Sequence, residues 1–174
     1  PHDNEPAGGI AGAGSCHNDP LCYSNWADIS DATCRLYFQG YVCSGQLTAT
    51  ASNDETPLIT TANHCISTSS GAASCEFRFK YRRTSCSGGV SNGVASNGAV
   101  LVDTYSTSDN TLLMIEDELP SNIYFIGWTT AGINTGASVT SLHHPAGDYQ
   151  RISFGNKVSS GICGSSNYWY GVGW

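Results

Sequence analysis

Two residues of this chain, a histidine and an aspartate, have neighbours suited to proton-transfer chemistry. His64 lies in residues 60–65 (TTANHC), directly before a cysteine, and Asp109 lies in residues 107–113 (TSDNTLL), at the start of an apolar run. A histidine that is fixed by a neighbouring disulfide and oriented by a carboxylate can act as a general base toward a hydroxyl nucleophile. His64 and Asp109 therefore supply two of the three groups of a Ser-His-Asp catalytic triad.

The third group, the nucleophilic serine, has no candidate with the usual surroundings. After Asp109 the sequence contains no Gly-x-Ser-Gly-type loop before its last residue, Trp174. We therefore expect this chain to carry the base and its carboxylate. The serine is expected to lie on sequence that is not present here.

Both residues also have a structural interpretation. A lone histidine is more often structural than catalytic, and Asp109 stands where a residue caps the turn before a strand. The order of the two segments, and the buried strand that residues 111–115 predict, favour the catalytic interpretation. Asp103, Glu116 and Asp117 are weaker candidates for the carboxylate.

The adjacent pair His143 and His144 raises the question of a metal site. Neighbouring residues on a strand point to opposite faces, so this pair is not suited to binding one ion, and we expect it in a turn. The sequence also lacks a dense acidic loop of the kind that holds calcium. We predict neither a metal nor another cofactor.

Composition favours a compact all-β protein and argues against two classes of partner. Of 174 residues, 12% are charged and 40% hydrophobic, with abundant glycine, which suits an all-β domain with many turns. The formal net charge of −7 argues against nucleic-acid and anionic-membrane partners, which require a basic surface. No apolar run is long enough to span a membrane. We expect no nucleic-acid and no membrane partner.

Short alternating or apolar runs, separated by Gly, Ser, Asn and Pro clusters, predict a series of strands. They cover residues 33–38, 41–47, 58–61, 76–82, 99–105 and 111–116, followed by 139–142 and 151–154. We expect a short turn at 62–66 that carries the histidine, a surface loop at 87–98 and a connector at 119–135. The basic side chains in and after the fourth run are expected on its solvated face: Arg78, Lys80, Arg82 and Arg83.

Two units follow from this pattern. Residues 1–120 form an N-terminal segment and a first β unit with His64 and Asp109, and residues 121–174 form a connector and the start of a second unit. The first five residues lack the basic start and apolar stretch of a signal peptide, so we expect a processed mature start.

The chain contains eight cysteines and no Cys-x-x-Cys pair, which favours disulfides over metal binding and predicts a secreted or periplasmic protein. Cys43 ends an apolar strand and Cys65 follows His64, so a bridge between them would pin the base to the wall of a barrel. The other pairings stay open at this point. The cysteines are Cys16, Cys22, Cys34, Cys43, Cys65, Cys75, Cys86 and Cys163.

Five segments together resemble the trypsin/chymotrypsin-like serine endopeptidases, nearest to the secreted bacterial lysyl-endopeptidase branch. They occur in the order found in that family: residues 15–22 (SCHNDPLC), 43–45 (CSG), 60–65 (TTANHC), 107–113 (TSDNTLL) and 143–153 (HHPAGDYQRIS). The resemblance implies a trypsin-like double β-barrel, with the first barrel complete and the second truncated in this chain. It also implies that His64 is the general base and Asp109 its orienting carboxylate.

The function implied is that of a secreted serine endopeptidase, which hydrolyses peptide bonds through an acyl-enzyme. The serine would lie on a C-terminal fragment or second chain, so the 174-residue chain alone is expected to be inactive. Ser165 and Ser166 come too early to match it. Cys163 stands where the lysyl-specific branch has a tryptophan, so lysine preference does not carry over. The alternative is a non-catalytic, protease-like binding or structural module.

The resemblance also implies cysteine partners. Cys22 would pair with Cys86 and Cys43 with Cys65, while Cys16 would reach a cysteine in the absent C-terminal part. Three cysteines then remain, so at least one of them needs a partner elsewhere or stays free. These three are Cys34, Cys75 and Cys163.

Overall fold

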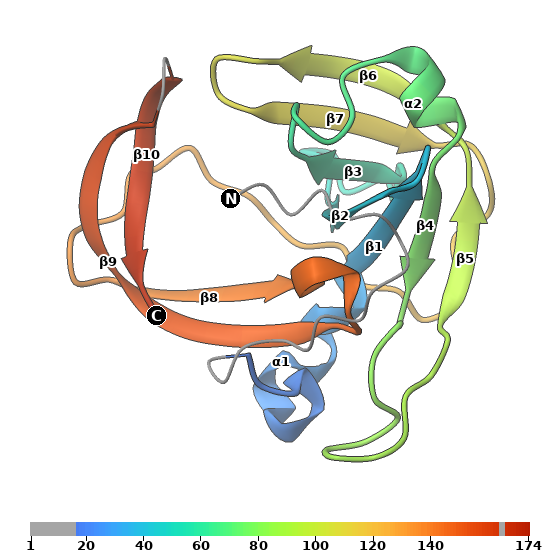
Figure 1. Ribbon diagram of the computed structural model, residues 1–174, viewed down its shortest axis with the longest axis horizontal. Coiled ribbons are helices and arrows are strands. Elements are labelled where there is room, and N and C mark those ends of the chain that lie inside the picture. The colour runs from blue at the N-terminus through green and yellow to red at the C-terminus, as the bar shows by residue number, and fades with distance from the viewer. Residues whose placement is uncertain (1–16, 164–165) are drawn as a thin grey trace.

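The computed structural model describes residues 17–163 and 166–174. Within these residues, ten strands form two antiparallel sheets, and the helices have at most five residues (Figure 1). The helices are η1 (Pro20–Cys22), α1 (Ser24–Ala27), η2 (Ile29–Ala32), α2 (Ser69–Ala73) and η3 (Pro145–Gly147). None of the helices in the described part of the chain is long and apolar enough to cross a membrane.

The first sheet has seven strands in the order β5-β4-β1-β2-β3-β7-β6. Its two outer strands, β5 and β6, are consecutive in the chain and separated by Gly98 alone, whose φ of +74° lets the backbone turn there. Because β5 pairs with β4 and β6 pairs with β7, this bend closes the sheet into a barrel. The strands are β1 (Thr33–Phe38), β2 (Tyr41–Thr48), β3 (Leu58–Thr61), β4 (Glu76–Phe79), β5 (Val94–Asn97), β6 (Ala99–Tyr105) and β7 (Asn110–Ile115).

Alternating side chains fill this barrel. Successive residues of a strand point to opposite faces, so every second residue of β1, β4 and β7 faces inward. The residues buried in this way include Leu36, Phe77, Phe79, Leu113 and Ile115, which belong to one hydrophobic core. The alternation of apolar and polar residues that predicted these strands therefore also places the apolar side chains inside the barrel.

The second sheet has three strands, in the order β10-β9-β8. They are β8 (Ser138–His143), β9 (Arg151–Cys163) and β10 (Ser166–Gly173). β9 curves around strongly, so the sheet forms an open half-barrel beside the first barrel (Figure 1). The expected fold is confirmed: the chain is all-β, with a closed first barrel and a partial second one. The boundary between units at residue 120 stays a prediction.

Some predicted boundaries were wrong. The expected loop 87–98 contains β5, whose buried Ser96 donates to the Glu118 carbonyl (2.6 Å), and no apolar pattern marks such a strand. The expected strand 76–82 stops at Phe79, because Lys80 has a φ of +55°. In the second sheet, the strand expected at 151–154 continues to Cys163, and β10 was not predicted.

The basic cluster does not form a purely solvated face. Arg82 and Lys80 form ion pairs with Asp31 (2.5 and 3.6 Å), and only 13% of the Arg82 side chain is exposed. Arg78 pairs with Glu76 on the same strand (2.8 Å). The ion pairs of Lys80 and Arg82 with Asp31 instead fasten the segment after β4 to the helical residues that precede β1.

Both disulfides implied by the family resemblance are present, Cys22–Cys86 and Cys43–Cys65. Cys34 and Cys75 are free thiols in the barrel core. Cys34 lies opposite Phe79 of β4, and Phe79 is four residues after Cys75 in the chain. At the rise of an extended strand, four residues span roughly 13 Å, so about this distance separates Cys34 from Cys75 along the sheet. That distance prevents a bridge unless the backbone moves.

Burial makes these two thiols poor nucleophiles. It raises the pKa of Cys75 to about 12 and raises that of Cys34 as well. Cys16 lies outside the described residues, and the side chain of Cys163 is likewise not described.

Gly45 of β2 tests how tightly the barrel is packed. A β-carbon at this position would lie 2.6 Å from Leu36 Cδ1 and 2.8 Å from Ile59 Cγ2, and both of these side chains are fully buried. We expect Gly45→Ala to lower the free energy of unfolding by about 1–3 kcal/mol, because the core must shift to accept it. Urea unfolding measures this loss.

Gly127→Ala is the matched control, since nothing lies within 4 Å of its added β-carbon. Equal stability of the two variants would contradict the packing described for β2.

Candidate active site

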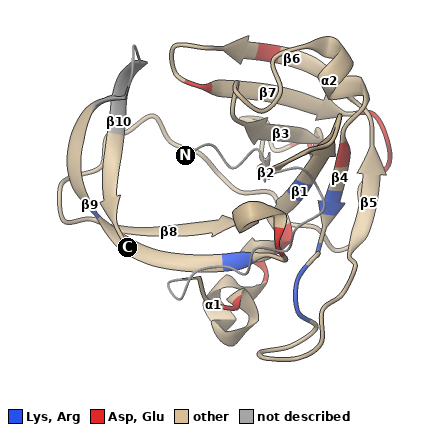
Figure 2. Cartoon of the chain, in the orientation of Figure 1, with Lys and Arg blue, Asp and Glu red and all other residues tan. Residues whose placement is uncertain are grey.

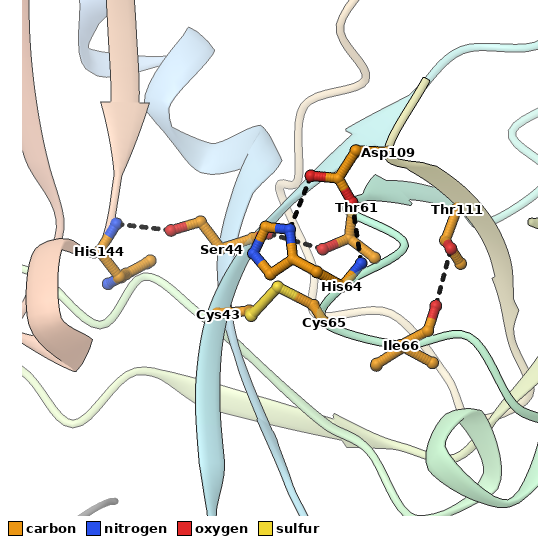
Figure 3. Close-up of a disulfide and its surroundings, with 9 residues drawn as sticks. All are labelled: Cys43, Ser44, Thr61, His64, Cys65, Ile66, Asp109, Thr111 and His144. Carbon is orange, nitrogen blue, oxygen red and sulfur yellow. Dashed lines mark hydrogen bonds and ion pairs between the residues drawn. A yellow bond between two sulfur atoms is a disulfide. The ribbon is translucent and has the colours of Figure 1, made fainter. Parts of the chain in front are cut away.

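His64 is held from both sides by the chain around it. β3 ends at Thr61, and the turn that follows is closed by the Cys65 and Ile66 amides, which donate to the Ala62 carbonyl (3.1 and 3.2 Å). Cys65 then bridges to Cys43 in the middle of β2 (Figure 3). The expected turn at 62–66 is therefore present, and the disulfide ties it to the barrel wall.

Asp109 reaches the same place from the β6–β7 turn. It has a φ of +50°, which aspartate adopts more readily than most residues, and its amide donates to the Ser106 carbonyl (3.3 Å). β7 runs antiparallel to β3, with Thr111 opposite Thr61. The residues just after β3 and just before β7 therefore meet at one end of the barrel.

The Asp109 carboxylate contacts His64 at two points, the ring and the backbone amide. The Asp109 Oδ2 atom lies 2.6 Å from His64 Nδ1, and Oδ1 accepts from the His64 backbone amide (2.8 Å) (Figure 3). A carboxylate can only accept here, so Nδ1 carries the proton and Nε2 presents the lone pair. The His64 side chain is 39% exposed, compared with 22% for Asp109, so the imidazole is the more solvent-exposed member of the pair.

A chain of hydroxyls, which no sequence pattern indicated, supports the contact. Thr111 Oγ1 donates to the Ile66 carbonyl (2.7 Å) and lies 2.6 Å from Thr104 Oγ1, which accepts from Asn63 Nδ2 (2.7 Å). Thr104 and Thr111 are opposite each other on β6 and β7. Only the strand register reveals that these threonines meet, because each alone resembles an ordinary strand residue.

The weaker carboxylate candidates have other surroundings. The Asp103 carboxylate accepts from the Thr104 amide (2.9 Å), and Glu116 lies at the opposite end of β7 from Asp109, where its amide donates to the Gly98 carbonyl (3.1 Å). Asp117 accepts from the Asn97 amide (3.1 Å), and hydrogen bonds from the Glu118 and Asn97 amides lower its pKa. The structure thus brings Asp109, and none of these three, to His64 Nδ1.

A cavity of about 350 Å³ opens beside His64. The end of β1, the β1–β2 turn and the segment after His64 line it. The lining residues are Phe38, Gln39, Tyr41, His64, Cys65, Ile66, Ser67, Thr68 and Gly71. A general base at the rim of such a cavity can take a proton from a group held in front of it.

His143 and His144 lie in different surroundings. His143 Nε2 lies 3.0 Å from His17 Nδ1, and its other ring nitrogen lies 3.0 Å from Ser141 Oγ. The buried His144 ring stacks on Tyr81 and donates Nδ1–H to the Asp148 carbonyl (3.0 Å). Burial, the largest cause, lowers the pKa of His144 to about 3, although the hydrogen bond to the Asp148 carbonyl partly opposes this.

The His144 backbone also links the two units close to the site. Its amide donates to Ser44 Oγ (2.8 Å), and Ser44 directly follows the disulfide cysteine Cys43 on β2 (Figure 3). The segment after β8 is thus hydrogen-bonded to the strand that the disulfide ties to the His64 turn.

Comparison with solved structures identifies the fold. The chain matches the inactive form of the Rv3671c protease of M. tuberculosis with a TM-score of 0.57 and 13% identity, over 85% of this chain and 64% of that one. It matches the HtrA-type protease AlgW, solved with a tripeptide, with the same TM-score of 0.57 and 20% identity, over 82% and 42% of the two chains. The fold is therefore that of the trypsin-like serine proteases, of which this chain holds a partial domain.

Sequence comparison then gives the family. The lysyl endopeptidase C-terminal domain model matches residues 10–174, so the chain belongs to that family. It is 26% identical over 170 residues to a lysyl endopeptidase of Pseudomonas aeruginosa, and 28% identical over 145 residues to the secreted RxLR effector protein 73 of Plasmopara viticola. These matches cover 88% and 76% of this chain, but only 37% and 35% of the relatives' lengths.

Replacing His144 by asparagine, which keeps an N–H donor near the Asp148 carbonyl, should reduce the acid sensitivity of the fold. Folded His144 takes up its proton near pH 3, whereas its unperturbed pKa is 6.5. Between these two pKa values the unfolded chain binds more protons than the folded chain. The contribution of neutral His144 to the free energy of unfolding is therefore fully present above pH 6.5 and is lost as the pH falls toward the folded pKa. Below pH 6.5, wild-type stability should therefore fall more steeply than that of the variant, by about 1.4 kcal/mol per pH unit.

Urea unfolding at several pH values on both sides of pH 6.5 measures both slopes. Above this value the two stabilities should differ by a constant amount. Parallel curves below it would contradict the neutral, buried state of His144.

Proposed function

We propose that this chain supplies the general base, His64, and its orienting carboxylate, Asp109, to a secreted serine endopeptidase. The observation that carries the proposal is the two-point contact of Asp109 with the His64 ring and amide, at the end of a closed trypsin-like barrel. Family membership supports it, since the chain belongs to a family of endopeptidase domains. The nucleophilic serine is proposed to lie on sequence that is not present here.

The mechanism follows from the state of the imidazole. His64 Nε2 takes the proton of the serine hydroxyl as its oxygen attacks the carbonyl carbon of the peptide bond. Asp109 stabilises the imidazolium that forms and keeps its Nδ1–H oriented. His64 then gives its proton to the leaving amine, and the acyl-enzyme that remains is hydrolysed by water in the same way.

The open face of the half-barrel supports a second proposal, that a C-terminal fragment or second chain packs here and brings the serine. A cavity of about 480 Å³ lies between the two units, with a largely apolar lining. β8, β9 and β10 carry only Arg151 and Lys157 as charged residues (Figure 2). Several large apolar side chains of these strands and of the last residue are exposed, and exposed apolar surface of this kind marks sites where a partner packs: Phe154, Val158, Tyr170 and Trp174. The lining residues are Trp26, Ile29, Gln46, Ile126, Val139, Thr140, Ser141, Leu142, Val172 and Trp174.

Secretion is supported by the cysteines and by one relative. Two disulfides are formed in the described residues, and such bonds persist in oxidising compartments. The Plasmopara viticola relative is named as a secreted protein. We propose protein or peptide as the substrate class, and lysine preference is not part of the proposal.

A non-catalytic, protease-like module is the alternative. One observation favours it: a curated relative 28% identical to this chain is named as an effector and not as a protease. The alternative gives the His64–Asp109 contact no chemical role, which makes the two proposals separable by experiment.

The test uses the native material and a fluorophosphonate, a reagent that labels activated serines. Intact mass is measured before and after reduction. We expect the reduced sample to contain this chain and a labelled serine-bearing part, and we expect the 174-residue chain alone to be unlabelled and inactive. In the assembled protein, Asp109→Asn should lower kcat by about 10⁴-fold, because it favours the wrong imidazole tautomer.

His17→Gln is the matched control, since His17 contacts His143 and not the proposed catalytic pair. Native material consisting of this chain alone, without label, would favour the non-catalytic module. Full activity of the Asp109→Asn protein would overturn the role given to the carboxylate.

A further inference from the structure

The His64–Asp109 pair lies directly against a disulfide, which the proposed reaction does not use. Cys43, His64 and Cys65 each offer a metal-ligand atom, and these three atoms lie within 4.8 Å of one another. This is the one group of three or more such side chains found among residues 17–161 and 170–174, whose side chains the structure describes. Both sulfurs are at present held in the disulfide (Figure 3).

We propose that reduction of Cys43–Cys65 creates a zinc site made of the two cysteine sulfurs and the His64 imidazole. A dithiol reductant supplies two electrons to the S–S bond and two protons to the sulfurs, and closes to its own disulfide. Binding of Zn²⁺ then releases one proton from each thiol, because the thiolate is the ligand. Two thiolates and one imidazole form a three-ligand set of the kind found in zinc sites with an open fourth position.

The backbone geometry suits this conversion. Tetrahedral zinc, with ligand distances of about 2.3 Å to sulfur and about 2.0 Å to nitrogen, places its donor atoms roughly 3.3–3.8 Å apart. The two sulfurs and a ring nitrogen of His64 already lie within 4.8 Å of one another. The sulfurs must separate by roughly 2 Å after reduction, and rotation of the two cysteine side chains achieves this while their Cα atoms remain 6.4 Å apart.

Asp109 already orients the histidine for a metal. Its Oδ2 atom holds His64 Nδ1 at 2.6 Å, so the lone pair is on Nε2. A carboxylate that holds the second nitrogen of a ligand histidine is the usual arrangement in zinc proteins, where it fixes the ring and raises its basicity. The group that would orient a base would thus equally orient a ligand.

Reductant, metal and a fourth ligand can reach the site. Cys43 and Cys65 are partly exposed, and His64 and Cys65 line the cavity of about 350 Å³. A water molecule in that cavity can complete the tetrahedron. The free thiols Cys34 and Cys75 are fully buried in the barrel core and do not compete.

One consequence depends on the proposed function, whereas the site itself does not. A His64 Nε2 bound to zinc cannot take a proton from a serine. The endopeptidase would therefore be switched off in reducing, zinc-containing surroundings, and restored by removal of the metal and reoxidation.

The experiment uses the full chain, reduced with dithiothreitol and desalted without oxygen. Co²⁺ serves as the spectroscopic probe and Zn²⁺ as its competitor. We expect one equivalent of Co²⁺ to give a sulfur-to-cobalt charge-transfer band and the visible bands of tetrahedral cobalt, both abolished by Zn²⁺. The oxidised chain should give neither, and circular dichroism should show that the reduced chain keeps its fold.

Variants assign the ligands. His64→Gln should weaken Co²⁺ affinity more than tenfold, and Asp109→Asn, which loses only the orienting carboxylate, by about 10–100-fold. The matched controls should keep wild-type affinity: Cys22→Ser with Cys86→Ser removes the other disulfide, and His17→Gln removes a distant histidine.

Three outcomes would overturn the site: no Co²⁺ binding by the reduced chain, unchanged affinity in His64→Gln, or unfolding upon reduction. Because this test needs no serine and no turnover, its failure is distinguishable from failure of fluorophosphonate labelling, which tests the endopeptidase.

Discussion

The antiparallel pairing of β3 with β7 is the constraint on which the site depends. It sets Thr61 opposite Thr111, so that the turn after one strand and the turn before the other meet at one end of the barrel. The same pairing places Ile59 opposite Leu113, which buries both in the core. A shift of one residue would turn these side chains outward and separate His64 from Asp109, so core packing and site geometry are fixed together.

The second unit is joined to this barrel by hydrogen bonds between buried or half-buried groups. Gln46 Nε2 donates to the Leu142 carbonyl (2.8 Å), Gln150 Nε2 donates to the Ser30 carbonyl (2.7 Å) and the Gln150 amide donates to the Tyr81 carbonyl (2.8 Å). Such bonds are directional, and leaving a buried partner unpaired is costly. They therefore fix the position of the half-barrel more specifically than apolar contact alone would.

The same local geometry is suited to two kinds of chemistry. In the two proposals, a disulfide, a histidine and a carboxylate next to one another would hold a base while the sulfurs are oxidised, and would offer ligands to a metal when they are reduced. What separates the two states is the bond between Cys43 and Cys65, since Asp109 orients the same imidazole nitrogen in both.

The sequence by itself determined the all-β class, the strands with apolar alternation, His64 and Asp109 as candidates, and the disulfide Cys43–Cys65. These depend on local pattern and on short motifs, which a chain carries without its fold. Only the tertiary structure decided that β5 and β10 are strands, that Thr104 and Thr111 support the histidine turn, and that Arg82 pairs with Asp31. The reason is that such residues are defined by a partner distant in sequence, and strand register and barrel closure supply that partner.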